Sequence, residues 1–260
     1  MPGMTTDGGG EGGLEVVPVG VGSAYARYGE AQSCYLVRAG DCRVCLDMGS
    51  GALNRLQVHV APEDLTAVVV SHLHPDHMID LLSLKVYLAW GPPAGRVMPV
   101  WGPAGLRARL AAHGDDGLDS LRFVPLDDAG GEVPLGEGMT LRYARVPHLD
   151  PTFALRVEHG GAALCFSADC RPNEALVDLA RGAAVLICEC SFGDGPVPDG
   201  VPHMSAADAG GIARRAGVGR LLLTHCYPEF DRDAALAAAR AAAGDGVAVE
   251  WATQDRAVRA

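Results

Sequence analysis

Short apolar runs bounded by polar or turn residues recur along the chain, and each predicts a buried strand. The runs at 14–21 and 66–70 are rich in valine. Residues 32–37 and 43–47 flank an Ala-Gly-Asp turn, as the two arms of a hairpin do. Further strands are expected at 121–126, paired with 139–146, and at 153–158, 164–169, 185–190, 221–224 and 247–251.

Helical patterns follow several of these strands. Residues 75–88 begin with a proline, which suits a first helical turn, and continue with apolar positions around much of the helix. Ser205 and Asp208 have the spacing of a capping box and predict a helix that begins there. Two more helices are expected at 105–113 and 233–243. Strands outnumber helices in each half, which predicts a layered domain of mixed α and β structure.

Composition and charge narrow the class of protein. A chain of 260 residues with 48% hydrophobic residues can bury a large core, which favours one domain over 14–260 after a glycine-rich, disordered leader at 1–13. No apolar run reaches the ~18 residues of a membrane span and the start lacks an export signal, so we expect a cytoplasmic protein without a membrane partner. The formal net charge of -11 argues against a broad surface for large nucleic acids, which requires lysine and arginine. A small anionic substrate remains compatible with this charge.

The eight cysteines lie mostly in apolar, strand-like runs. This placement indicates small, reduced core residues rather than a disulfide framework. Cys42 and Cys45 have the spacing of a redox pair, but they fall on a predicted strand, which argues against a thioredoxin-like role.

The densest group of chemically active side chains follows the strand at 66–70, where His72, His74, Asp76 and His77 lie within six residues. Side chains two apart on an extended segment point the same way, so His72 and His74 can face one point. Imidazole and carboxylate are ligands for borderline ions such as zinc, whereas calcium and magnesium call for oxygen ligands alone. The sequence therefore predicts a transition-metal site.

The pattern His-x-His-x-Asp-His resembles the signature of the metallo-β-lactamase-fold hydrolases, and the rest of the chain continues the resemblance. His148 and His225 end predicted strands, and Asp169 stands in Ser-Ala-Asp-Cys where many members have Ser-Gly-Asp-Thr. The resemblance implies an α+β fold, a four-layer αββα sandwich, and two divalent metal ions. One ion would be held by His72, His74 and His148, the other by Asp76, His77 and His225, with Asp169 between them.

The same resemblance indicates which metal and which reaction to expect. Zinc is the first choice, and manganese and iron are alternatives because the ligand types do not separate them. Two ions held close together activate water, so the implied reaction is hydrolysis. Asp47, at the end of the strand at 43–47, matches a family aspartate that orders the loops beneath the metals without binding them.

Glu189 and His203 resemble a pair found in the phosphodiesterase branch, which includes the tRNA 3′-processing endonucleases (ribonuclease Z-like enzymes). In that reading a hydroxide held by the metals and Asp76 attacks phosphorus. His203, held by Glu189, acts as general acid or as a donor to a phosphate oxygen. The catalytic residues implied are therefore Asp76, Glu189 and His203.

The substrate expected from this resemblance is a small phosphodiester. The tRNA-processing enzymes carry a long basic arm between the third and fourth motifs, and only a short segment separates His148 from Asp169 here. A cyclic nucleotide or a phosphoribosyl cyclic phosphate fits this compact form, and a large nucleic acid is not expected.

Other functions remain open from the sequence. The same metal site could serve a thioesterase, a lactonase or a hydrolase of glutathione conjugates, for which His203 would be dispensable. A tRNA 3′-processing endonuclease and a binding protein with purely structural metals are further alternatives. Related enzymes are often dimers, and a homodimer is compatible with the sequence.

Overall fold

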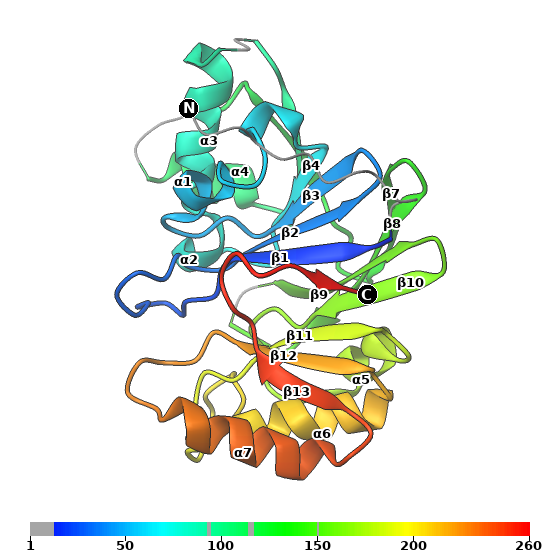
Figure 1. Cartoon of the computed structure of the whole chain (residues 1–260). Helices are drawn as coiled ribbons and strands as arrows, with labels where there is room; N and C mark the ends of the chain where they lie inside the picture. Colours follow the sequence, from blue (N-terminus) through cyan, green and yellow to red (C-terminus); the bar gives the residue numbers. More distant parts are fainter. Residues whose placement is uncertain (1–12, 93–94, 114–116, 150) are drawn as a thin grey trace, which may run out of the picture.

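The computed structural model describes residues 13–92, 95–113, 117–149 and 151–260. Of the leader expected at 1–13, only Gly13 falls within this part. Two seven-stranded sheets lie face to face, with helices covering the outer face of each (Figure 1). The chain is therefore the four-layer αββα sandwich expected from the resemblance. In the described part of the chain, no helix is long and apolar enough to cross a membrane.

The first sheet has the strand order β14-β1-β2-β3-β4-β5-β6. Its strands are β1 (Glu15–Gly20), β2 (Cys34–Ala39), β3 (Cys42–Leu46), β4 (Ala67–Val69), β5 (Met98–Gly102), β6 (Leu121–Pro125) and β14 (Val258–Arg259). Strands β14 to β3 are antiparallel, and β3 to β6 are parallel. The helices of this half are α1 (Ala52–Leu56), α2 (Pro75–Met78), α3 (Leu81–Trp90) and α4 (Leu106–Ala111).

The second sheet has the order β13-β12-β11-β10-β9-β8-β7 and repeats this plan, antiparallel first and then parallel. Its strands are β7 (Gly131–Gly136), β8 (Met139–Val146), β9 (Thr152–His159), β10 (Ala162–Phe166), β11 (Val185–Glu189), β12 (Arg220–Thr224) and β13 (Ala248–Trp251). Its helices are α5 (Glu174–Ala180), α6 (Ala206–Ala216) and α7 (Arg232–Ala243).

Strand residues alternate between two cores because successive side chains of a strand point to opposite faces. In β2, Tyr35 and Val37 pack between the two sheets, whereas Cys34 and Leu36 pack under the helices of the first half. The second sheet likewise buries its other face under α5, α6 and α7. All eight cysteines are free and buried, as expected for core residues.

The structure corrects three expectations about elements. The helix expected at 75–88 is two helices, because the chain turns at Ile79 and Asp80 between α2 and α3. The expected pair of 121–126 with 139–146 is wrong, because β6 and β8 lie in different sheets and β8 pairs with β7 and β9. A strand beyond 251 was not expected, yet β14 pairs with β1 at the edge of the first sheet.

The close packing of α6 on α7 generates a prediction about adjacent glycines. A Cβ at Gly210 would overlap the carbonyl oxygen of Ala239, whereas a Cβ at Gly211 meets open space. We expect Gly210→Ala to lower the free energy of unfolding by about 1–3 kcal/mol through overpacking. Gly211→Ala, the matched control, should raise it by about 0.5–1 kcal/mol because glycine disfavours a helix interior. Urea unfolding of both variants tests this, and equal effects would contradict it.

Candidate metal centre

The site lies at one edge of the sandwich because parallel strands end together. β3 and β4 are parallel neighbours, and the segment 71–77 follows β4. β8 and β10 both run antiparallel to β9, so His148 and Asp169, which follow them, reach the same edge of the second sheet. Backbone hydrogen bonds from Phe153 N to the Ser71 carbonyl and from His225 N to the Val21 carbonyl, each 3.0 Å, join the edges of the two sheets.

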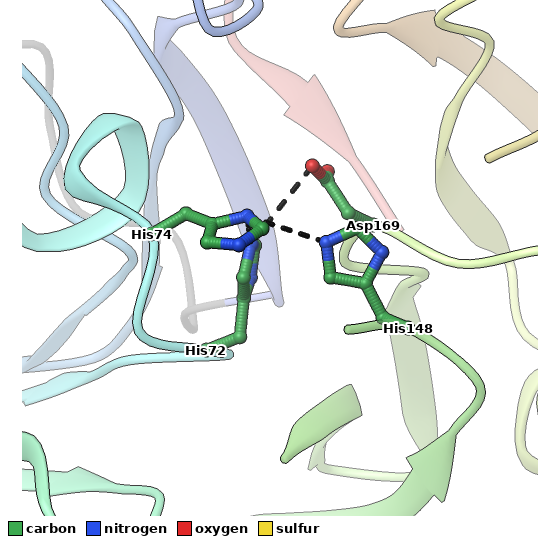
Figure 2. Close-up of side chains that lie close together, drawn as sticks. All are labelled: His72, His74, His148 and Asp169. Atoms are coloured by element: carbon green, nitrogen blue, oxygen red, sulfur yellow. Dashed lines mark hydrogen bonds and ion pairs between the residues drawn. The ribbon is translucent and has the colours of Figure 1, made fainter. Parts of the chain in front are cut away.

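The first cluster consists of three imidazoles and a carboxylate that point toward one another (Figure 2). His74 Nδ1 lies 3.1 Å from His72 Nε2 and 3.3 Å from His148 Nε2. Burial, together with the neighbouring His77, holds the pKa of His72 well below its ordinary value. His72 is therefore neutral, and neutral imidazole is the form that binds a metal.

The second cluster lies beside the first and holds two imidazoles and two carboxylates. Nε2 of His77 and Nε2 of His225 are 3.3 Å apart, and Asp76 Oδ2 lies 3.4 Å and 3.2 Å from them respectively. Asp76 is largely buried, which raises its pKa, but the adjacent His77 and His225 outweigh burial and keep the pKa below its ordinary value. Asp76 therefore stays ionised, which is the state of a ligand.

Asp169 faces both clusters. One carboxylate oxygen lies 3.5 Å from His77 Nε2, and the other lies 3.5 Å from His225 Nε2 and 3.9 Å from His72 Nε2. Burial raises the pKa of Asp169, but His225 and His77 hold it well below its ordinary value. A buried, ionised carboxylate between two imidazole groups is in the position expected of a bridging ligand.

These residues fit a pair of divalent cations. In each cluster the ligand atoms all lie within 4.8 Å of one another. Lone pairs of buried nitrogen and oxygen atoms brought this close have no favourable arrangement unless protons or cations lie between them. A donor set of imidazole and carboxylate suits zinc, manganese or iron. All seven residues expected as ligands are thus brought together, four in the first cluster and four in the second, with Asp169 common to both.

His72 and His77, which follow the first sheet, are oriented by hydrogen bonds to Nδ1, the ring nitrogen that faces away from the clusters. His77 Nδ1 donates to Asp47 Oδ2 at 2.6 Å, so Nε2 is the ring nitrogen that faces the cluster. Ser71 Oγ donates to the same carboxylate at 3.0 Å and lies 3.1 Å from His72 Nδ1, from which it can accept. Asp47 therefore lies behind these imidazoles and outside both clusters. No role was predicted for Ser71, and the available signal was its position between a strand and the first histidine.

A second serine orients a histidine that follows the second sheet. Ser191 Oγ accepts from His225 Nδ1 at 3.1 Å and donates to Glu189 Oε2 at 2.6 Å. His148 Nδ1 donates to the carbonyl of Pro202 at 3.0 Å. In each case Nε2 is the ring nitrogen that faces the cluster, as in metal-binding histidines, whose other ring nitrogen is hydrogen-bonded. No role was predicted for Ser191, because its hydrogen-bond partner His225 follows a different strand and is distant in the sequence.

Glu189 and His203 form a third group with Asp169. His203 Nδ1 donates to Glu189 Oε1 at 2.9 Å, and its distance to Asp169 Oδ2 is 4.0 Å. Glu189 is fully buried and also accepts the backbone N–H groups of Cys170 and Ser191. Burial lowers the pKa of His203, but the hydrogen bond and charge of Glu189 raise it to about 9. His203 is therefore a cationic donor at the edge of the metal clusters.

Unusual backbone conformations hold three of these turns. Asp47, Ala168 and His225 all have positive φ, at 59°, 52° and 57°, which is uncommon for residues other than glycine. The value at Ala168 explains why glycine suits this position of the Ser-x-Asp motif. After β3, Gly49 permits a close approach, because a Cβ there would overlap the carbonyl oxygen of Asp76.

Comparison with known proteins shows that the chain is similar to members of one family. Residues 43–226 match the family model described as the beta-lactamase superfamily domain. An uncharacterized protein of Mycobacterium tuberculosis is 34% identical over 218 residues, which cover 80% of this chain and 79% of that protein. A ribonuclease Z of Mycobacterium bovis is 31% identical over 247 residues, covering 83% and 86% of the two chains.

A solved structure gives the same fold. The metallo-beta-lactamase fold protein YhfI from Bacillus subtilis superposes with a TM-score of 0.86 at 24% identity, and the match covers 96% of this chain and 100% of that one. In sequence, YhfI is described as a probable metallo-hydrolase and is 29% identical over 222 residues, 84% of this chain and 88% of its own.

The hydrogen bond between Asp47 and His77 predicts that this carboxylate strengthens metal binding by orienting the imidazole of His77. Asp47→Asn keeps the size of the side chain but removes the charge that orients His77 Nδ1–H. We expect about 10- to 100-fold weaker zinc binding, measured by competition with a chromogenic chelator. Asp41→Asn, at an exposed ion pair with Arg43, is the control and should bind zinc as the wild type does. Unchanged affinity in the Asp47 variant would contradict this role.

Proposed function

Because the chain belongs to the beta-lactamase superfamily and is similar throughout to metallo-hydrolases, we propose that it is a dinuclear phosphodiesterase acting on a small, cyclic phosphodiester. The observation that carries the proposal is His203, bonded to a buried Glu189 and facing Asp169. A cationic imidazole beside a metal pair suits a phosphate, whose leaving oxygen needs a proton and whose other oxygens are anionic.

We assign the metal ligands as the clusters suggest. One cation would be held by His72, His74 and His148, the other by Asp76, His77 and His225, with Asp169 shared. Zinc is the proposed metal, with manganese and iron as alternatives. When bound, such a pair activates water for attack and neutralises charge on the substrate.

The protein's own groups would then handle protons and orientation. Asp76, ionised and close to both imidazoles of its cluster, accepts a hydrogen bond from the attacking water and fixes its direction. His203 donates its Nε2 proton to the departing oxygen, because Nδ1 is committed to Glu189. Glu189 keeps His203 cationic and oriented, and through Ser191 it also holds His225.

Two features support a small substrate over a long nucleic acid. The segment between His148 and Asp169 is occupied by the hairpin of β9 and β10, which belongs to the second sheet. The net charge of -11 disfavours contact with many phosphates. The ribonuclease Z relative makes precursor tRNA the natural comparison substrate, and thioesters and lactones test the other hydrolase classes.

The role of His203 predicts a dependence on the leaving group. We expect His203→Ala to lower kcat roughly 10²–10⁴-fold for a cyclic nucleotide, whose alkoxide leaving group needs a proton. The loss should be much smaller for bis-p-nitrophenyl phosphate, because p-nitrophenolate leaves without one. Metal content should stay at the wild-type level, since His203 is not among the proposed ligands.

The comparison has clear controls. Removing metal with a chelator should abolish turnover of both phosphodiesters in the wild type, and added zinc should restore it. Equal losses on the two substrates would contradict the general-acid role. If no phosphodiester is turned over, while a thioester or lactone is hydrolysed equally well by wild type and His203→Ala, the phosphodiesterase assignment is wrong.

A further inference from the structure

An aromatic stack adjoins the proposed catalytic group. The rings of Tyr25 and Tyr227 lie 4.9 Å apart between centroids and are inclined by only 6°, so they are stacked face to face. Tyr25 belongs to the loop between β1 and β2, and Tyr227 follows β12. The two residues come from opposite halves of the sandwich, on the same side as the metal clusters.

Tyr227 connects this stack to the site. It is two residues from His225, and its backbone N–H donates to the carbonyl of Ser191 at 3.1 Å. Its ring centroid lies 6.2 Å from that of His203 and 5.7 Å from that of Phe192, in edge-to-face contact with both. Tyr227 therefore stands between His203 and Tyr25.

The outer ring is held in place although it is exposed. Tyr25 remains 54% exposed, yet its hydroxyl donates to Glu229 at 2.7 Å. In the same loop, Arg27 donates to the carbonyls of Tyr227 and Phe230 at 3.3 Å and 2.9 Å. The two Arg27 contacts attach the loop to the second half without any need for an aromatic ring. The exposed ring is thus an oriented planar surface with one face against Tyr227.

We propose that Tyr25, supported by Tyr227, is a stacking surface for a nucleobase of the substrate. This inference rests on the proposed function and narrows its substrate class to nucleoside phosphodiesters over base-free sugar phosphates. A nucleotide carries its base one sugar away from phosphorus, and Tyr25 lies two ring contacts from His203, with Tyr227 between them. Aromatic side chains bind bases of any sequence through their faces, so the stack provides affinity for the base without a hydrogen-bonding code.

The structure offers a matched control in the same loop. Tyr28 is also a tyrosine but is fully exposed. Tyr25→Ala removes the stacking ring, Tyr25→Phe retains the ring and removes the hydroxyl that binds Glu229, and Tyr28→Ala removes an exposed ring outside the stack. The three variants separate the loss of stacking from the loss of loop attachment and from a general loss of aromatic surface.

The first measurement is turnover by the metal-loaded, full-length protein. Its substrates are adenosine 3′,5′-cyclic phosphate and the 3′,5′-cyclic phosphate of methyl riboside, which lacks a base. We expect the wild type to favour the nucleotide in kcat/KM. Tyr25→Ala should reduce that preference about fivefold or more, mainly through KM, whereas Tyr25→Phe and Tyr28→Ala should retain most of it. Equal kcat/KM for the two substrates in the wild type would overturn the proposal.

The second measurement is binding, which does not require turnover. Calorimetry with AMP and with ribose 5-phosphate should show tighter binding of AMP, and Tyr25→Ala should remove most of that difference. A phosphodiesterase that hydrolyses both cyclic phosphates without preference would retain the proposed function and refute the stacking surface. A protein that prefers AMP through Tyr25 but cleaves no phosphodiester would retain the surface and refute the proposed function.

Discussion

The structure depends on gathering seven imidazole and carboxylate groups, five of them buried and two partly buried, at one edge where two sheets meet. Such groups are costly to bury unless each is hydrogen-bonded or shares a cation. Part of this requirement is met by hydrogen bonds on the side away from the clusters, where Asp47 and Ser191 accept from Nδ1 of His77 and His225. Their Nε2 atoms and the Asp169 carboxylate face one another, and a pair of divalent cations would bind to these atoms.

The topology explains how distant residues meet. Each half of the chain forms an antiparallel meander followed by parallel strands. The seven clustered residues follow β4, β8, β10 and β12, whose carboxyl ends all lie at the same edge of the sandwich. Three non-glycine residues with positive φ turn the chain at these ends. Glu189 binds His203 directly and His225 through Ser191, so one buried carboxylate orients both imidazoles. Under the proposed function, this arrangement would couple proton transfer and metal binding through a single side chain.

Much of this arrangement could be predicted from local pattern. Apolar runs followed by histidine or aspartate marked the strand ends, and His72 with His74 followed from strand periodicity alone. The positions of His148, Asp169 and His225 depended on the family resemblance, because nothing local shows that separate strand ends converge. The pairing of β6 with β8 was wrong for a related reason: periodicity identifies strands but does not say which sheet they join. The tyrosine stack joins residues about 200 positions apart and leaves no local signal.

The most direct test of the account is a crystal structure of the native protein with anomalous scattering recorded at the zinc, iron and manganese edges. The account predicts two transition-metal peaks per chain, one among His72, His74 and His148 and one among Asp76, His77 and His225, with the Asp169 carboxylate between them. An active protein with no anomalous peak at these residues, or with a single peak that excludes Asp169, would contradict it.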